Sequence, residues 1–190
     1  MPCSTNLLVT ALFLTVCVES LAQAPTYNRG KTATDEEIRA WNIDIDVDGK
    51  GLPPGSGTAP EGAKLFVQKC AVCHGPTAEG GIAKRLLGGK GSLTSNKPVK
   101  TIGSFWPYAT TLWDFINRAM PASQPGSLRP DEVYALTAFL LFRNEVIQEG
   151  DVMDAKTLPK IQMPNRNGFF PEVPMWKPGM KRPLGFYPNQ

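Results

Sequence analysis

Cys70-Ala71-Val72-Cys73-His74 contains the single histidine of this 190-residue chain and the only two cysteines beyond residue 17. Two thiols three positions apart on one helical turn can both add to the vinyl groups of one porphyrin, and the adjacent imidazole can then reach the iron. The C-x-x-C-H pattern is therefore typical of covalent haem attachment. It predicts one haem c, held by Cys70 and Cys73 with His74 as an axial ligand, and no second haem because the pattern occurs once.

Other chemistries also use closely spaced cysteines. A redox-active pair of the thioredoxin type would lie in a βαβ pattern, which the flanking sequence lacks. A structural zinc site needs four ligands, and no further histidine, nor any cysteine beyond residue 73, is present to supply them. A disulfide between Cys70 and Cys73 would suit an exported chain, but the histidine that follows directly favours haem.

The ligand on the opposite face of the iron cannot be a second histidine, so methionine, lysine, tyrosine or an open position remain. We favour Met120, which ends an expected helix before Pro121 and leaves enough chain to wrap the haem and return on its far face. Met163, before Pro164, is the second choice. The other methionines beyond the N-terminal segment are Met153, Met175 and Met180.

Ligation by one histidine and one methionine would close both axial positions of the iron. Methionine raises the reduction potential, and a closed iron suits outer-sphere electron transfer better than oxygen or peroxide chemistry. We therefore expect an electron carrier that is not an enzyme on its own. A haem enzyme or sensor with a displaceable sixth ligand is the competing interpretation.

The N-terminus is typical of a secretory signal peptide over residues 1–24. Leu7 to Val18 form an apolar run that is shorter than the about 20 residues of a membrane-spanning helix. Cleavage is expected after Ala22 or Ala24, although the segment lacks Lys and Arg and could instead remain as a short anchor. No other segment is apolar over such a length, so we predict a periplasmic protein without a membrane span after cleavage.

Composition and helix signals divide the rest of the chain. With 18 Gly and 18 Pro the sequence favours many turns over one large helical bundle. We predict a mostly α fold, with helices around one covalent haem, an extended N-terminal arm and a Pro-rich tail. The predicted regions are residues 1–24 (signal peptide), 25–57 (N-terminal extension), 58–150 (haem domain) and 151–190 (Pro-rich irregular tail).

Several helix boundaries are marked by their residues. Thr34 followed by three carboxylates predicts a short helix to about Trp41. A helix that delivers Cys70 begins near Pro60. The next has Thr110 or Thr111 as its cap and is stopped by Pro121, and the last begins at Pro130. Residues 43–48 alternate apolar and acidic side chains and predict an edge strand or an extended arm, and residues 51–57 a linker.

Charge is distributed unevenly along the chain. Residues 25–60 carry a net charge of −2, and residues 61–190 a net charge of +6. A basic rim around an exposed haem edge would attract an acidic redox partner. Nucleic acid is not an expected partner. The basic residues close to the haem motif in sequence are Lys64, Lys69, Lys84, Arg85, Lys90, Lys97 and Lys100.

Gly62, Phe66, the C-x-x-C-H motif, the Met120 loop and the string DEVYALTAFLL (131–141) resemble the class I cytochrome c domain. More narrowly, the 131–141 string and three others resemble the cytochrome subunit, of the SoxD type, of bacterial sulfur or sulfite dehydrogenases. The resemblance covers about residues 35–170 and implies Cys70 and Cys73 as haem attachments and His74 and Met120 as ligands. The other three strings are GLPPGSGTA (51–59), KPVKTIGSFWPYATTLWDFINRAMP (97–121) and MDAKTLPKIQMPNRNGF (153–169).

In that family the cytochrome pairs with a molybdenum-containing dehydrogenase subunit and takes its electrons. The resemblance thus implies a periplasmic electron-transfer subunit of a sulfite or sulfur dehydrogenase, which passes electrons to a downstream cytochrome c or oxidase of the respiratory chain. A free-standing soluble carrier is the alternative. In one departure, many class I cytochromes orient the ligand histidine with a proline carbonyl, where this chain has Lys84 or Arg85.

Overall fold

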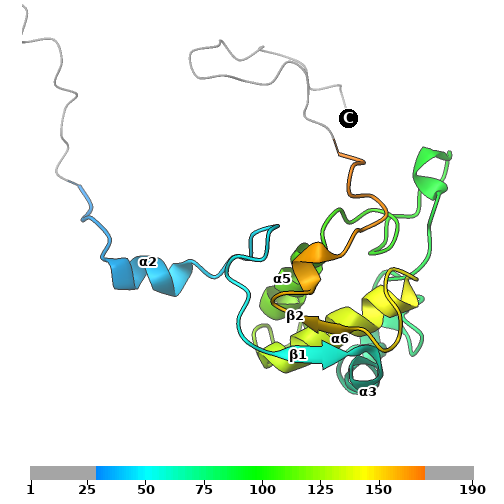
Figure 1. The fold of residues 1–190 in the computed structure, drawn as a ribbon, viewed down its shortest axis with the longest axis horizontal. Helices are drawn as coiled ribbons and strands as arrows, with labels where there is room; N and C mark the ends of the chain where they lie inside the picture. The colour runs from blue at the N-terminus through cyan, green and yellow to red at the C-terminus, as the bar shows by residue number, and fades with distance from the viewer. Residues whose placement is uncertain (1–28, 170–190) are drawn as a thin grey trace, which may run out of the picture. The chain divides into compact units, whose positions relative to one another are not determined.

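The computed structural model describes residues 29–169 (Figure 1). The expected signal segment lies outside this range. So do residues 170–190, which include Met175 and Met180. The chain divides into two compact units between residues 42 and 43. Helices predominate, which confirms the mostly α prediction. In chain order the elements are α2 (Asp35–Trp41), β1 (Ser56–Thr58), α3 (Ala59–Lys69), α4 (Ala71–His74), the 3₁₀ helix η2 (Ser92–Thr94), α5 (Ala109–Ala119), α6 (Pro130–Arg143), β2 (Val152–Asp154) and η3 (Leu158–Lys160).

Helix α2, in the first unit, begins with a capping box. The Thr34 hydroxyl accepts a hydrogen bond from the backbone N–H of Glu37 at 3.2 Å, and the Glu37 carboxylate accepts one from the N–H of Thr34 at 2.9 Å. Lys31 forms an ion pair with the same carboxylate at 2.7 Å, and this contact and the Thr34 N–H lower the pKa of Glu37. The predicted short helix that ends at Trp41 is confirmed.

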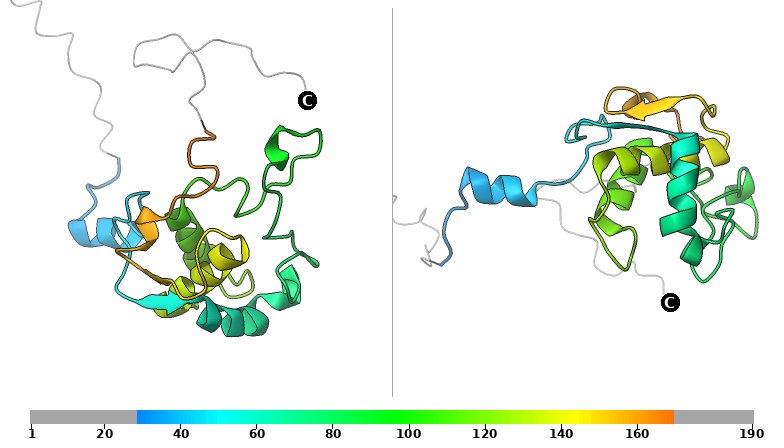
Figure 2. Two further views of the ribbon diagram at one scale, coloured as in Figure 1. Left: turned by 45° about the vertical axis from the view of Figure 1, so that its right-hand side comes forward. Right: turned by 90° about the horizontal axis from the view of Figure 1, so that it is seen from below.

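In the second unit, helices α3 and α6 cross (Figure 2), and α3 meets α6 through Gly62, which has no side chain. A Cβ atom on Gly62 would overlap the carbonyl oxygen of Ala135, and one on Gly57 would overlap the backbone of the same residue. Beside the crossing, the rings of Phe66 and Phe139 pack with their centroids 5.1 Å apart. The two glycines thus set how closely the chain before the haem motif approaches α6.

A two-stranded antiparallel sheet joins the segments on either side of the helices. Gly57 of β1 pairs with Met153 of β2, and Thr58 pairs with Val152. The Tyr134 hydroxyl of α6 donates a hydrogen bond to the carbonyl of Pro53 at 2.9 Å. Residues 51–57, expected as a linker, therefore pack on α6, and the packed unit includes chain on both sides of residues 58–150.

The segment after β2 also packs onto the helices. Met153, Leu158 and Met163 are buried. Asn165 donates its side-chain N–H to the carbonyl of Phe105 at 2.7 Å, and the Arg166 guanidinium lies 4.3 Å from the ring centre of Tyr108. Residues 151–169 thus hold the loop that leads into α5. Within residues 29–169, no helix is long and apolar enough to cross a membrane.

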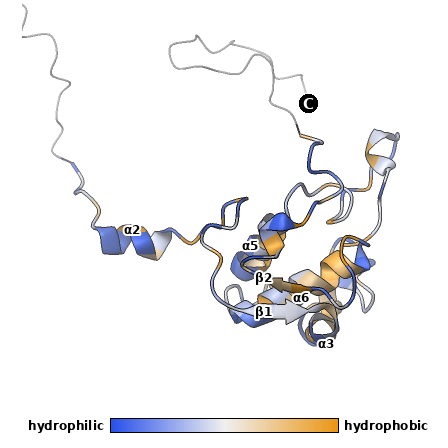
Figure 3. Cartoon of the chain, viewed as in Figure 1, coloured by the Kyte–Doolittle hydropathy of each residue, from blue (hydrophilic) through white to orange (hydrophobic). Residues whose placement is uncertain are grey.

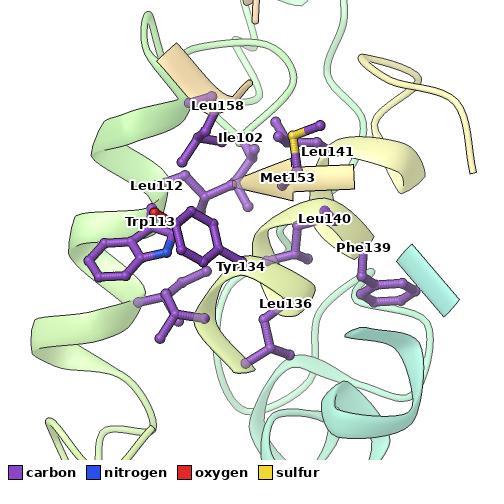
Figure 4. Close-up of a cluster of buried hydrophobic side chains, with 14 of the residues drawn as sticks. Ile102, Leu112, Trp113, Tyr134, Leu136, Phe139, Leu140, Leu141, Met153 and Leu158 are labelled. Carbon is purple, nitrogen blue, oxygen red and sulfur yellow. The ribbon is translucent and has the colours of Figure 1, made fainter. Parts of the chain in front are cut away.

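The core lies between α5, α6 and these flanking segments (Figure 4). Trp113 of α5 packs against Tyr134 of α6 with ring centroids 5.4 Å apart. Burial, and to a smaller extent the charge of Asp154, raise the pKa of Tyr134 to about 12. Helix α6 is buried on most of its circumference, and Figure 3 shows that much of it is hydrophobic. This explains why its sequence is apolar almost throughout.

Two local predictions differ from the structure. Helix α5 begins at Ala109 after Tyr108, and no side chain caps its first turn. Thr110, one of the two threonines expected to cap it, is instead the second residue of the helix, and its side chain is buried in the protein. Residues 43–46 form neither a helix nor a strand. A turn follows, in which the Gly49 N–H donates to the carbonyl of Asp46 at 3.0 Å. Of the two forms expected for this segment, the edge strand is therefore not formed.

Candidate haem site

The end of α3 and the short helix α4 bring the motif residues onto one helical turn. Helix α3 starts with the Thr58 N–H donating to the Glu61 carboxylate at 2.9 Å, and it ends where the Cys70 N–H donates to the carbonyl of Phe66 at 2.9 Å. The backbone N–H groups of Cys73 and His74 both donate to the carbonyl of Cys70, at 3.1 and 3.0 Å. The two thiols and the imidazole therefore come from one hydrogen-bonded helical turn.

Both thiols are free and half-buried, so Cys70 and Cys73 form no disulfide with each other. Burial is the main reason that the pKa of Cys70 rises to about 11. A thiol with a raised pKa is a poor nucleophile at neutral pH, in contrast to the low-pKa cysteines of thiol–disulfide oxidoreductases. The raised pKa of Cys70 therefore does not favour a redox-active C-x-x-C pair.

The imidazole of His74 has a defined orientation. Its Nδ1 lies 2.9 Å from the carbonyl oxygen of Lys84. Because a carbonyl can only accept, Nδ1 carries the proton, and the lone pair of Nε2 is left for a metal. Lys84 thus supplies the carbonyl that a proline supplies in many class I cytochromes.

The loop between His74 and Lys84 folds back closely on the motif. The Ala83 N–H donates to the carbonyl of Cys73, and the Gly80 N–H donates to that of His74, both at 2.9 Å. Gly75, directly after the motif, has a φ of +77°, and a Cβ atom there would overlap the backbone of Gly80. This glycine therefore permits the sharp reversal that brings the Lys84 carbonyl to the imidazole.

Three of the candidate methionines lie among the described residues. Met120 directly follows the last residue of α5, and its side chain is only partly buried against the core. Met153 and Met163 are enclosed by protein, with 2% and 3% of their surfaces exposed. Of these three methionines, Met120 is thus the one that the protein does not fully enclose.

The similarity of the chain to known proteins agrees with this geometry. A family model described as "Cytochrome c" matches residues 59–142. A chain in the crystal structure of the sulfane dehydrogenase SoxCD from Paracoccus pantotrophus is 39% identical in sequence, with a TM-score of 0.71. The alignment covers 87% of this chain and 86% of that one. The chain belongs to the cytochrome c family. It is a SoxD-like class I cytochrome. No curated protein matches it significantly.

The surface of the cytochrome next to the motif combines exposed apolar and basic side chains. Val72 and Ile82 are 80% and 87% exposed, and Lys84 and Arg85 are exposed beside Ile82. Other members of the expected basic rim have partners of their own. Lys69 pairs with Glu132 at 3.0 Å, Lys90 with Glu145 at 3.8 Å, and Lys100 lies over the ring of Phe105.

Glu132 connects the start of α6 to the end of α3 in this cytochrome. Its carboxylate accepts the Arg129 N–H at 2.9 Å and the Lys69 ammonium at 3.0 Å. These contacts, the backbone N–H foremost, hold the pKa of Glu132 below its usual 4.5. A carboxylate with a lowered pKa adds stability above its unfolded-state pKa, and this contribution is lost as the pH falls through the folded-state pKa. The helix junction next to Cys70 is thus pH-sensitive in the acid range.

We expect Glu132→Gln to lower the free energy of unfolding by about 1–2 kcal/mol at pH 7. The difference from the wild type should shrink below about pH 4, because the wild-type carboxyl is then becoming protonated. Urea unfolding of the haem-loaded protein at pH 7 and in acid checks both points. Glu145→Gln, at an exposed ion pair, is the control and should change the stability little. Equal losses at both pH values would contradict the assignment.

Proposed function

We propose that this cytochrome holds one haem c through thioether bonds to Cys70 and Cys73, with His74 and Met120 as axial ligands. The observation that carries the proposal is the hydrogen bond from His74 Nδ1 to the Lys84 carbonyl, which leaves Nε2 for iron. The two half-buried thiols on the same helical turn support it. The haem would supply reversible one-electron chemistry at its iron.

The residues around the motif would tune that chemistry. A carbonyl that accepts a hydrogen bond from the non-ligating ring nitrogen of a histidine fixes the orientation of the ring. It also raises the basicity of the nitrogen that binds the metal. Met120 would raise the reduction potential and close the second axial position. These features favour electron transfer over reaction of the iron with small molecules.

We further propose that the electron donor is a molybdenum-containing sulfite or sulfur dehydrogenase subunit in the periplasm, and that a downstream cytochrome c or oxidase accepts the electrons. The similarity to a SoxCD chain extends over 87% of this chain, well beyond the haem domain itself. The apolar side chains of Val72 and Ile82, bordered by Lys84 and Arg85, fit an acidic partner surface that approaches the haem. A free-standing carrier would need only the compact haem domain.

Co-expression of the exported chain with a SoxC-type dehydrogenase subunit from the same organism tests the proposal. We expect the two to elute together as a stoichiometric complex in size-exclusion chromatography. Sulfite or a sulfane-sulfur substrate should then reduce the haem, as seen in the visible absorption spectrum. A cytochrome that elutes alone but is reduced by the dehydrogenase would favour the free-standing carrier. A haem that is not reduced under any of these conditions would contradict the proposal.

A further inference from the structure

Helix α2 presents apolar side chains that the haem site does not use. Ile38 and Trp41 are 52% and 87% exposed. They stand three positions apart, so they lie on the same face of the helix. Tryptophan is enriched among the residues that dominate binding energies at protein interfaces.

The helix is pre-formed although it is short. It has seven residues, none of them buried, and an isolated helix of this length is marginal in water. The Thr34–Glu37 capping box and the Lys31–Glu37 ion pair hold its first turn. A pre-formed helix with one apolar face is suited to a groove, because little ordering remains to be done on binding.

The charges of the helix define the kind of groove that fits. Asp35, Glu36 and Glu37 fill its first turn, while Arg39 is its only basic residue. Between residues 31 and 48 the sequence has six carboxylates and two basic side chains, a net charge of −4. The complementary surface is therefore an apolar groove with basic residues along its rim.

The similarity to the SoxCD chain includes this helix. The alignment covers 87% of the chain, and residues 43–190 alone are too few to account for that share. The segment that carries α2 is thus aligned with a chain of a dehydrogenase, outside the residues 59–142 that define the cytochrome c domain. This favours the dehydrogenase subunit as the partner that covers Ile38 and Trp41.

We propose that Ile38 and Trp41 of α2 dock into an apolar, basic-rimmed groove on the molybdenum dehydrogenase subunit. The inference rests on the proposed function. Docking by α2 would tether the cytochrome and raise the effective concentration of its haem surface at the donor. The surface of Val72 and Ile82 could then bind weakly and exchange electrons without having to supply the affinity of the complex.

The test measures the dissociation constant between the full-length, haem-loaded cytochrome and the purified dehydrogenase subunit by calorimetry. We expect the Ile38→Ala/Trp41→Ala double variant to bind at least roughly 30-fold more weakly than the wild type. Its haem spectrum, and its reduction rate at saturating dehydrogenase, should stay unchanged. Val152→Ala, which removes another exposed apolar side chain on β2, is the matched control and should bind like the wild type.

Other results would overturn the inference in distinguishable ways. If the wild type binds and the double variant binds equally well, α2 is not the docking element, and the proposed function stands. If affinity is unchanged and the double variant alone unfolds at a lower temperature, α2 covers its own haem domain. If the wild type forms dimers in sedimentation and the double variant does not, the helix binds a second copy of the chain. If the wild type binds anionic vesicles and the double variant does not, the helix binds a membrane. If the wild type does not bind the dehydrogenase, the proposed function falls together with the inference.

Discussion

Gly62→Val should strongly destabilise the haem domain. The new side chain would overlap the carbonyl oxygen of Ala135, and a backbone atom in the middle of α6 cannot move aside alone. The two helices must separate, which also pulls Phe66 away from Phe139. Overpacking of this kind costs about 1–3 kcal/mol or more, and we expect the upper end, because the contact is with backbone. Thermal unfolding of the haem-loaded protein, followed by circular dichroism, should show a midpoint lower by roughly 5–10 °C.

Gly150→Ala is the matched control for this variant. No atom lies within 4 Å of a Cβ placed at Gly150, and its φ is compatible with alanine. We expect its stability to stay within about 0.5 kcal/mol of the wild type. Gly62→Val unfolding at the wild-type temperature would show that the close crossing of α3 and α6 is not required. Equal destabilisation by both variants would point to a general effect of replacing glycine.

Met120→Ala should abolish the sulfur-to-iron charge-transfer band of the oxidised protein and lower its reduction potential. Methionine ligation raises haem potentials relative to nitrogen or water ligands. The expected drop is a substantial part of the about 0.8 V range over which axial ligands set haem potentials. Absorption spectroscopy and a redox titration of the haem-loaded variant check the two effects. The variant should also bind small ligands such as cyanide faster, because one axial position is no longer closed.

Met163→Leu is the control that separates ligation from packing. Met163 is buried in the core with 3% of its surface exposed, and a swap that conserves volume there costs less than about 1.5 kcal/mol. The variant should keep the charge-transfer band and the wild-type potential. A Met120→Ala protein with an unchanged spectrum would contradict the assignment and favour a haem enzyme or sensor with another sixth ligand. Loss of the band in Met163→Leu would instead make Met163 the ligand.

The local parts of the fold could be predicted because their signals are short in range. The capping residue Thr34, the first-turn proline of α6 and the one-turn spacing of the motif each act within a few residues, and the corresponding helices are present as expected. The mostly α class follows from these elements. The failed cap at Thr110 has a physical reason too. That side chain is buried, and α5 begins at Ala109, two residues before the start that a Thr110 cap would give.

Contacts between distant segments could not be read from the sequence. The carbonyl that orients His74 is a backbone group, and any residue type at position 84 could supply it. Only the path of the loop decides this, so neither Lys84 nor Arg85 could be chosen in advance. The pairing of Gly57 with Met153 is similar, because strands of three residues carry almost no periodicity. Residues 51–57 therefore resembled a linker although they form part of the packed unit.

The pairing of β1 with β2 limits where the haem domain can be cut out and fused to another protein. Its two strands flank the motif, α5 and α6 along the chain, and Met153, Leu158 and Met163 fill the core from beyond the last helix. A fusion that ends the domain at the last residue of α6 would leave β1 without its partner strand β2. It would also remove three buried side chains from the core. A gene fusion that keeps this domain folded must therefore include the haem segment together with the flanking segments that carry β1 and β2.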